Sequence, residues 1–372
     1  MSNLKNIGVI GMGTLGKSHA RVALEYPGAK LCAVCDLFES QTKDFIEKNP
    51  GVRSYTDYNE MFRDEKFDII IVATQDPYHK GPLLAAINAG VRDIICEKPL
   101  TTTIGDADEV MNAAAAAGTS VYLCFMLRMS PFNRAVRALV KSGIMGKTLH
   151  GEFVNDDSIH VPQKLWGDRS AEWAKASSPI QFLFSHTIDC LRFFFNPAEV
   201  VKVYAIGKQE GTGSFCDYCD ALLTWSDGSV MRIKTDWTRK IATLVENYSV
   251  YTFEDAGVIL RSTDAAGRPL LRVDFMDKAK MDQAAELLMG AGFTIHMQTS
   301  PKAYAKYAIL MNPEENGGAR SFPASTYILD YIFGDKTYEE NIVNLAGGYK
   351  QVKVIDAILK SMELDKPVEI TY

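Results

Sequence analysis

The chain has 372 residues, of which 47% are hydrophobic and 23% are charged, and its formal net charge is -6. This composition is typical of a folded globular protein, and the length exceeds what one hydrophobic core usually holds, so we expect two domains. The acidic balance and the lack of a basic, aromatic-rich stretch argue against nucleic-acid binding, and no apolar run is long enough to cross a membrane. The amino terminus has no apolar signal core, and the cysteine count of seven is odd. Together these features predict a cytoplasmic protein with free thiols.

The first stretch, LKNIGVIGMGTLGKSHARVAL, predicts a strand, a glycine turn and a helix. Glycines at 11, 13 and 16 have the spacing that permits a tight turn, close approach of the backbone to a pyrophosphate, and close packing of helix on strand. The amino terminus of the helix, at Thr14 and Leu15, would then face the phosphates. The pattern predicts dinucleotide binding by Gly11, Gly13, Thr14, Leu15 and Gly16.

The next strand, KLCAVCD, ends at Asp36, about twenty residues beyond the last glycine. A carboxylate at this position accepts hydrogen bonds from the ribose hydroxyls and repels a 2′-phosphate. No arginine follows it in LFES, so NAD is favoured over NADP. The alternative is a nucleotide-free turn in which Asp36 caps a helix.

Strands and helices alternate from there to Phe125, which predicts a doubly wound parallel sheet. One of these strands, FDIIIVAT, ends at Thr74 and opens into the loop TQDPYHKG. Because ligands bind at the carboxyl ends of such strands, Thr74, Gln75 and His79 are expected to line the nicotinamide side of the cofactor site. His79 could equally be a histidine that only starts the following helix.

The stretch IICEKPL, at 94–100, predicts a buried strand that surfaces at Glu97 and Lys98. Lys98 precedes a proline, which biases it toward an extended conformation and permits a cis bond. Its ammonium can therefore be aimed into the ligand site, with Glu97 beside it at the cofactor. The alternative is a surface turn with a solvated Glu-Lys pair.

Beyond Phe125 the pattern changes to successive strands without intervening helices, which predicts an antiparallel sheet in an α+β domain. We therefore expect a Rossmann domain at 1–125 and a substrate and oligomerisation domain at 126–372. Helices are expected at 131–141, 180–195 and 281–289, while 263–320 is otherwise hard to interpret. The C-x-x-C pairs at Cys32/Cys35 and Cys216/Cys219 lack the features of a zinc site, so no metal is predicted.

Several motifs together resemble one known family. They are GMGTLG followed by His19, the carboxylate Asp36, the triplet EKP, the segment FMLRMSPF, a helix with H-x-x-D-x-L-R, and the ending SMELDKPVEI. Over nearly the whole chain the sequence resembles the glucose-fructose oxidoreductase, inositol dehydrogenase and rhizopine catabolism (Gfo/Idh/MocA) family. The resemblance implies a Rossmann domain, then an α/β domain whose open sheet packs against another subunit, and NAD(P)-dependent oxidation of a sugar or cyclitol hydroxyl.

Carried over by residue, the resemblance implies that Lys98 lies between the nicotinamide and the reacting hydroxyl, and that His186 transfers the proton. The alternative for His186 is a hydrogen-bonded core histidine on an apolar helix. An imidazole suits removal of a hydroxyl proton near neutral pH, and an ammonium stabilises a developing alkoxide. The chain departs from the family at Phe182, where an aspartate one helical turn before the histidine is usual. Asp189, Asp156 or Asp157 could replace that carboxylate, or the histidine could act alone.

A second departure lies after Phe125 and Met126, where the family often has two arginines and this chain has Leu127 and Arg128. The stretch DDSIHVPQKLWGDRSAEWAKASSP would form a substrate loop. Indole rings stack on sugar faces, and charged or imidazole groups bind hydroxyls. The substrate-binding residues expected are Arg128, Asp156, Asp157, His160, Trp166, Arg169, Trp173 and Asp189.

The sequence therefore predicts an NAD-dependent dehydrogenase of a small polyhydroxylated substrate, with Lys98 and His186 at its centre, forming a homodimer or homotetramer. An NAD-sensing regulatory protein without turnover is an alternative to which Phe182 points. Another is an enzyme that uses bound NAD for transient oxidation during elimination or hydrolysis.

Overall fold

The computed structural model describes residues 4–261, 270–300, 306–316 and 323–372, and the chain divides into two compact units. Unit 1 comprises 1–126 and 322–353, and unit 2 comprises 127–321 and 354–372. The expected division at residue 125 did not include the return of 322–353 to the first unit. That return has a packing reason, because the apolar side of helix α12 (Ser325–Ile332) buries Tyr327, Ile328 and Leu329.

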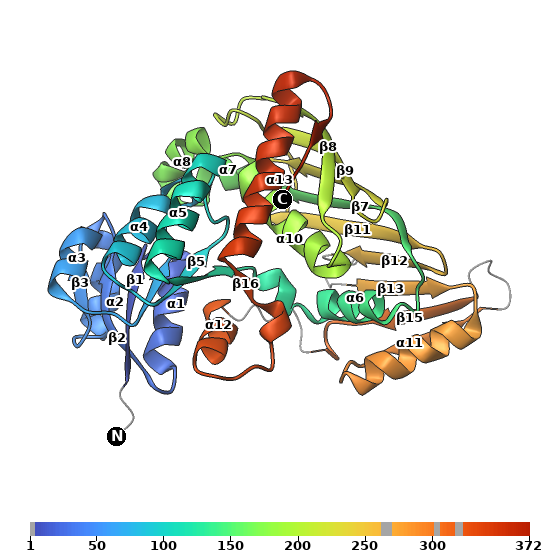
Figure 1. Cartoon of the computed structure of the whole chain (residues 1–372), viewed down its shortest axis with the longest axis horizontal. Helices are drawn as coiled ribbons and strands as arrows, with labels where there is room; N and C mark the ends of the chain where they lie inside the picture. Colours follow the sequence, from blue (N-terminus) through green and yellow to red (C-terminus); the bar gives the residue numbers. More distant parts are fainter. Residues whose placement is uncertain (1–3, 262–269, 301–305, 317–322) are drawn as a thin grey trace. The chain divides into compact units, whose positions relative to one another are not determined.

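Unit 1 contains a seven-stranded sheet in the order β16-β6-β5-β4-β1-β2-β3 (Figure 1). All its pairings are parallel except that of β16 with β6. Its strands are β1 (Lys5–Ile10), β2 (Ala29–Cys35), β3 (Arg53–Tyr55), β4 (Ile69–Val72), β5 (Asp93–Glu97), β6 (Ser120–Cys124) and β16 (Val343–Asn344). The expected doubly wound parallel sheet is thus present.

Helices cover both faces of this sheet, which explains why every residue of β4 and β5 is buried. The order reverses between β1 and β4, and right-handed crossovers then send the helices after these two strands to opposite faces. The helices are α1 (Thr14–Glu25), α2 (Glu39–Lys48), α3 (Tyr58–Asp64), α4 (Lys80–Asn88), α5 (Ile104–Ala117), α12 and the first part of α13 (Leu345–Leu364), with short 3-10 turns at Asp76–Tyr78 and Glu339–Asn341. A further 3-10 turn, Met126–Met129, begins at the last residue of the first segment of unit 1 and continues into unit 2.

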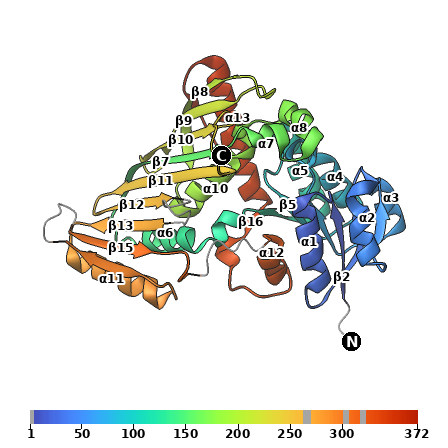
Figure 2. The ribbon, with the colours of Figure 1, turned by 180° about the vertical axis from the view of Figure 1, so that it is seen from behind.

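Unit 2 is built on a ten-stranded sheet in the order β14-β15-β13-β12-β11-β7-β10-β9-β8-β17, and Figure 2 shows most of these strands side by side. Only the β7–β10 pairing is parallel, so the sheet is mostly antiparallel, as expected. The strands are β7 (Thr148–Asp157), β8 (Val200–Lys208), β9 (Tyr218–Trp225), β10 (Val230–Asp236), β11 (Val245–Phe253), β12 (Ala256–Arg261), β13 (Leu270–Phe275), β14 (His296–Thr299), β15 (Tyr307–Met311) and β17 (Val368–Glu369).

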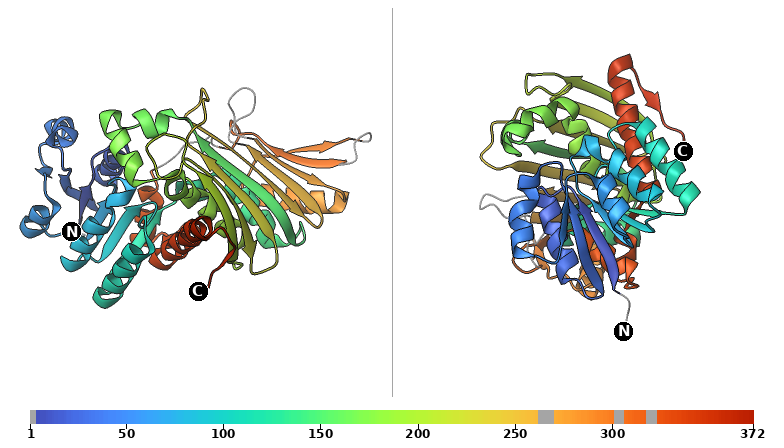
Figure 3. Two further views of the ribbon diagram at one scale, coloured as in Figure 1. Left: turned by 90° about the horizontal axis from the view of Figure 1, so that it is seen from above. Right: turned by 90° about the vertical axis from the view of Figure 1, so that its left-hand side faces the viewer.

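The two faces of this sheet differ. One face packs against helices and forms a large apolar core (Figure 3). The other carries exposed apolar side chains on alternate positions, including Tyr204, Ile206, Leu222 and Val250. The helices of the unit are α6 (Pro131–Ser142), α7 (His160–Lys164), α8 (Ser170–Ala176), α9 (Pro179–Phe182), α10 (Phe184–Phe195), α11 (Lys278–Gly290) and the last part of α13, with a 3-10 turn at Gly167–Arg169.

The hard-to-interpret segment 263–320 supplies β13, β14, β15 and α11, while 262–269, 301–305 and 317–322 lie outside the described residues. All seven cysteines are in the described part of the chain, and all are free thiols. None of the helices in the described ranges combines the length and apolar character that crossing a bilayer requires.

Candidate active site

The glycine turn has the geometry that its spacing predicts. Gly11 has a φ of 91°, and a Cβ there would lie 2.5 Å from the backbone of Ala73. A Cβ on Gly16 would lie 1.7 Å from the carbonyl oxygen of Gly11, so only glycine allows α1 to approach the turn this closely. Gly13, by contrast, has no heavy atom within 4 Å of where its Cβ would be. The open side of the turn therefore leaves room for a phosphate group at the start of α1.

Asp36 is held next to this turn by the backbone. Its Oδ2 accepts a hydrogen bond from the Met12 amide at 2.7 Å, and its Oδ1 accepts one from the Phe38 amide at 3.0 Å. The Asp36 side chain is only half-buried, and a carboxylate offers about four acceptor positions. It can therefore still accept from ribose hydroxyls, which is what the spacing predicts.

The loop after β4 is organised around His79. One ring nitrogen of His79, Nδ1, lies 2.6 Å from the carbonyl oxygen of Pro99, and Nε2 lies 3.1 Å from that of Thr74. His79 is 1% exposed. The expectation that its imidazole lines the cofactor site is therefore corrected, since the ring instead ties the loop after β4 to the turn after β5. Gln75 precedes the short helical turn at Asp76–Tyr78, where the Tyr78 carbonyl accepts from the Thr74 hydroxyl.

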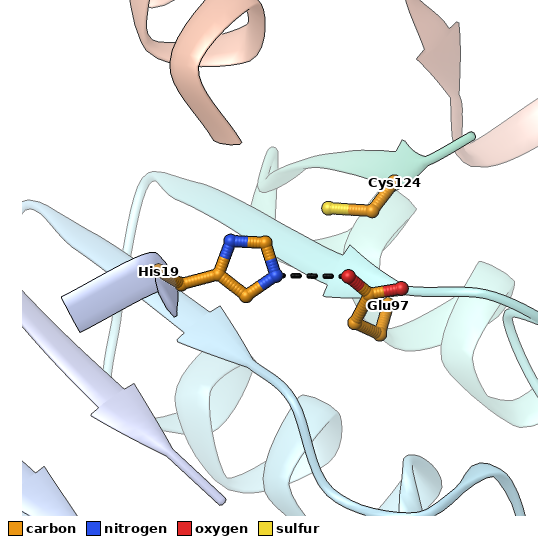
Figure 4. A group of neighbouring side chains, drawn as sticks. All are labelled: His19, Glu97 and Cys124. Atoms are coloured by element: carbon orange, nitrogen blue, oxygen red, sulfur yellow. Dashed lines mark hydrogen bonds and ion pairs between the residues drawn. The ribbon is translucent and has the colours of Figure 1, made fainter. Parts of the chain in front are cut away.

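Glu97 ends β5 and is bonded to a residue of the glycine helix. Figure 4 shows His19 directed at Glu97, with its Nε2 2.8 Å from Oε1. The other ring nitrogen lies 2.7 Å from the Ser325 hydroxyl of α12, and Glu97 Oε2 accepts from the Lys98 amide at 3.3 Å. Burial of Glu97 raises its pKa, but the hydrogen bond from His19 and the positive charges of His19 and Lys98 outweigh it, so the pKa is lowered overall.

Lys98 follows directly, at the carboxyl end of β5, with a cis bond to Pro99 and only 7% of its surface exposed. The solvated surface pair is thus ruled out for Glu97 and Lys98. Lys98 instead belongs to a turn that begins next to Glu97. Glu97 is hydrogen-bonded to His19 of α1, and His19 is hydrogen-bonded to Ser325 of α12. Sequence reasoning missed this connection, because Ser325 is more than 200 residues from Lys98 and carries no motif of its own.

Cys124 completes a cluster with His19 and Glu97, because β6 places it opposite Glu97 in the sheet. The ligand atoms of the three buried residues lie within 4.8 Å of one another (Figure 4). Their spacing would suit a metal ion, which the sequence did not predict. The His19–Glu97 hydrogen bond already satisfies two of the three groups, and burial raises the pKa of the Cys124 thiol well above its usual range.

In unit 2, Arg128 and Asp189 bind each other. The guanidinium donates from Nε to Oδ2 at 2.8 Å and from Nη2 to Oδ1 at 2.7 Å, and it lies over the ring of Phe193. Asp189 is 1% exposed. Both carboxylate oxygens of Asp189 therefore face Arg128, which gives the pair a role in fixing α10 to the turn at Met126–Met129.

His186 lies in the first turn of α10, and Phe182, at the end of α9, precedes it. Phe182 joins an aromatic cluster with Trp166, Trp173 and Trp237, in which ring centroids lie 4.1 to 6.2 Å apart. Trp173 is 1% exposed and touches all three other rings. Its expected stacking on substrate is therefore corrected to packing, whereas Trp166 remains partly exposed.

The two aspartates that end β7 lie on opposite faces of the sheet, because successive strand residues alternate. Asp156 Oδ2 accepts from Lys234 and Arg239, both at 2.8 Å, on the face away from the helices. Asp157 lies on the helix side, where its Oδ2 accepts from the indole N–H of Trp237 at 3.2 Å. Asp156 thus belongs to an ion-pair network of the sheet and not to the substrate site, while the exposed His160 begins α7.

Residues 5–125 match a family model described as an oxidoreductase family with an NAD-binding Rossmann fold, and 133–252 match the GFO/IDH/MocA C-terminal domain. The chain belongs to the Gfo/Idh/MocA family. Its unit 1 carries the NAD-binding domain of that family, and the glycine turn and Asp36 fit this cofactor.

Three similar proteins illustrate the relationship. Inositol 2-dehydrogenase from Acidothermus cellulolyticus is 29% identical over 232 residues, which are 62% of this chain and 63% of that protein, so the match spans less than two thirds of either. Crystal structures of myo-inositol 2-dehydrogenase from Lactobacillus plantarum (20% identity, TM-score 0.72) and of scyllo-inositol dehydrogenase from Lactobacillus casei with NAD(H) and scyllo-inositol (18%, 0.69) share the fold. The first match covers 99% of this chain and 100% of that one, and the second covers 98% and 99%.

Proposed function

We propose that the protein is an NAD-dependent dehydrogenase that oxidises a secondary hydroxyl of a sugar, glycoside, sugar acid or inositol. The observation that carries the proposal is Lys98, buried in its turn at the carboxyl end of β5. β5 neighbours β4, the strand at the order reversal, and sheets of this kind bind ligands at the carboxyl ends of their strands near such a reversal. The inositol 2-dehydrogenase named above supports the substrate class.

NAD, when bound, accepts the hydride that leaves the carbinol carbon. The proposed role of His186 is to take the proton of the hydroxyl as the carbon–oxygen double bond forms. The Lys98 ammonium stabilises negative charge on that oxygen during the transfer. Within the expected substrate loop, we assign hydroxyl binding to His160 and Arg169 and stacking on a sugar face to Trp166, because each of these side chains is at least partly exposed.

Formation of NADH over a panel of sugars and inositols tests the activity, and Lys98→Ala and His186→Ala test the roles. Each variant should lose about a hundredfold or more in kcat, because it removes a group acting in the transition state, while NAD binding stays near normal. Lys48→Ala and His150→Ala are matched controls, since both side chains are exposed and belong to α2 and β7 rather than to the β5 turn or α10. Full activity in His186→Ala would assign proton transfer to another residue.

A regulatory protein that binds NAD without turnover is the second candidate, and Phe182 in place of the usual aspartate favours it. Tight NAD binding with no NADH formed from any substrate of the panel would support that candidate. Conversion of substrate without net NADH would instead indicate transient oxidation within an elimination or hydrolysis.

The free thiols of all seven cysteines support a location in the cytoplasm. The apolar side chains on the open face of the ten-stranded sheet support a homodimer or homotetramer, because a face of this kind is usually covered.

A further inference from the structure

The helix side of β7 meets the first turn of α10 at one carbonyl group. The Leu183 carbonyl oxygen accepts from the His186 amide at 3.0 Å and from the Asn155 side chain at 3.5 Å. Asn155 and Asp157 are two residues apart on the strand, so their side chains lie on the same face. The end of β7 that carries Asp157 is thereby tied to the turn that carries His186.

Trp237 links Asp157 to the position where the family usually has its aspartate. Its indole N–H donates to Asp157 Oδ2, and its ring packs against the ring of Phe182 with centroids 6.2 Å apart. Phe182 ends α9, four residues before His186 in the first turn of α10. Trp237 is fully buried and Asp157 is 1% exposed, so the carboxylate lies in an aromatic, water-poor environment. Charges act over longer distances in such an environment than they do in water.

We propose that Asp157 is the carboxylate that positions the His186 imidazole and supports its protonated form, in place of the aspartate that Phe182 replaces. This role rests on the proposed function of His186. The carboxylate has moved from the helix to the neighbouring strand, and Phe182, Trp166, Trp173 and Trp237 fill the space around it. An aspartate at position 182 is therefore not needed for this role.

Other charged groups around this site have different partners. On the opposite face of the sheet, Asp156, Lys234, Asp236 and Arg239 form ion pairs with one another. On α10 itself, Asp189 is bound to Arg128. His160, at the start of α7, is exposed. These groups make Asp156 a matched control for Asp157, because the two carboxylates are adjacent in sequence and lie on opposite faces.

The test is an NMR titration of the His186 imidazole in the full-length protein, with its signal among the six histidines identified by its loss in His186→Gln. Asp157→Asn should lower the pKa of His186 by about one unit or more, since a nearby carboxylate favours the charged imidazole. Asp156→Asn should leave it unchanged. An unchanged pKa in Asp157→Asn, or equal shifts in both variants, would overturn the proposal.

A second variant guards against loss of the fold. Asp157→Ser removes the charge and leaves a smaller polar side chain at the same place, and it should lower the His186 pKa in the same way. Adding Phe182→Asp to either variant should restore the pKa, which a purely structural role of Asp157 would not predict. Because the titration needs no turnover, it separates failure of this inference from failure of the proposed dehydrogenase activity. If activity is found, the acid limb of kcat should move down with the pKa while the KM for NAD stays constant.

Discussion

Replacing Glu97 with glutamine should weaken unit 1 with little change in its packing, because the two side chains have nearly the same shape. The His19 Nε2 to Glu97 Oε1 distance is 2.8 Å, and the residues are 1% and 9% exposed, so solvent screens the bond little. A hydrogen bond to a charged group contributes about 1.5–3 kcal/mol, against about 1 kcal/mol for a neutral one. Glu97→Gln should therefore lower the local free energy of unfolding by about 1–2 kcal/mol.

The effect should depend on pH in a defined direction. The pKa of Glu97 is lowered in the folded state, because burial, which raises it, is outweighed by the bond and charge of His19 and by the charge of Lys98. A carboxyl group of this kind stabilises the fold fully above its unfolded pKa and loses that contribution as the pH falls through its folded value. The difference between wild type and Glu97→Gln should thus be complete at neutral pH and shrink below the ordinary value of 4.5.

Amide hydrogen exchange of β5 and α1 across this pH range measures the local stability, and urea unfolding of the full chain measures the whole. Glu109→Gln is a suitable control, since Glu109 accepts from Lys80 at the surface and should matter little. Equal protection of β5 in wild type and Glu97→Gln at neutral pH would refute the reasoning, as would a difference that grows in acid.

Two further predictions concern the cofactor and the assembly. Asp36→Ala should narrow the preference for NAD over NADP measured by titration, since it removes the carboxylate that accepts from ribose and repels a 2′-phosphate; an unchanged preference would place Asp36 away from the ribose. Ile206→Glu, at a side chain 52% exposed on the open sheet face, should reduce the assembly observed by sedimentation toward the 41.2 kDa monomer. Wild-type protein that already sediments as a monomer at micromolar concentration would contradict the proposed oligomer.

Features that depend only on residues close together in the sequence could be predicted from the sequence. The glycine spacing, the position of Asp36 and the alternation of strands and helices are local patterns, because turn geometry and burial on both faces of a sheet select residue types directly. They led correctly to the Rossmann fold and to NAD. The placement of Lys98 at the end of its strand followed from the same reasoning.

Other features required the tertiary structure. The hydrogen bonds of His19 with Glu97 and Ser325 join three segments that are far apart in the sequence. No local sequence pattern predicts that these segments lie side by side. Whether Asp156 or Asp157 faces the helices depends on strand register, in which a shift of one residue exchanges the two faces. Trp173 is of the residue type that stacks on sugars, yet the residues packed around it bury its ring. Burial depends on what packs around a side chain, which the residue type does not determine.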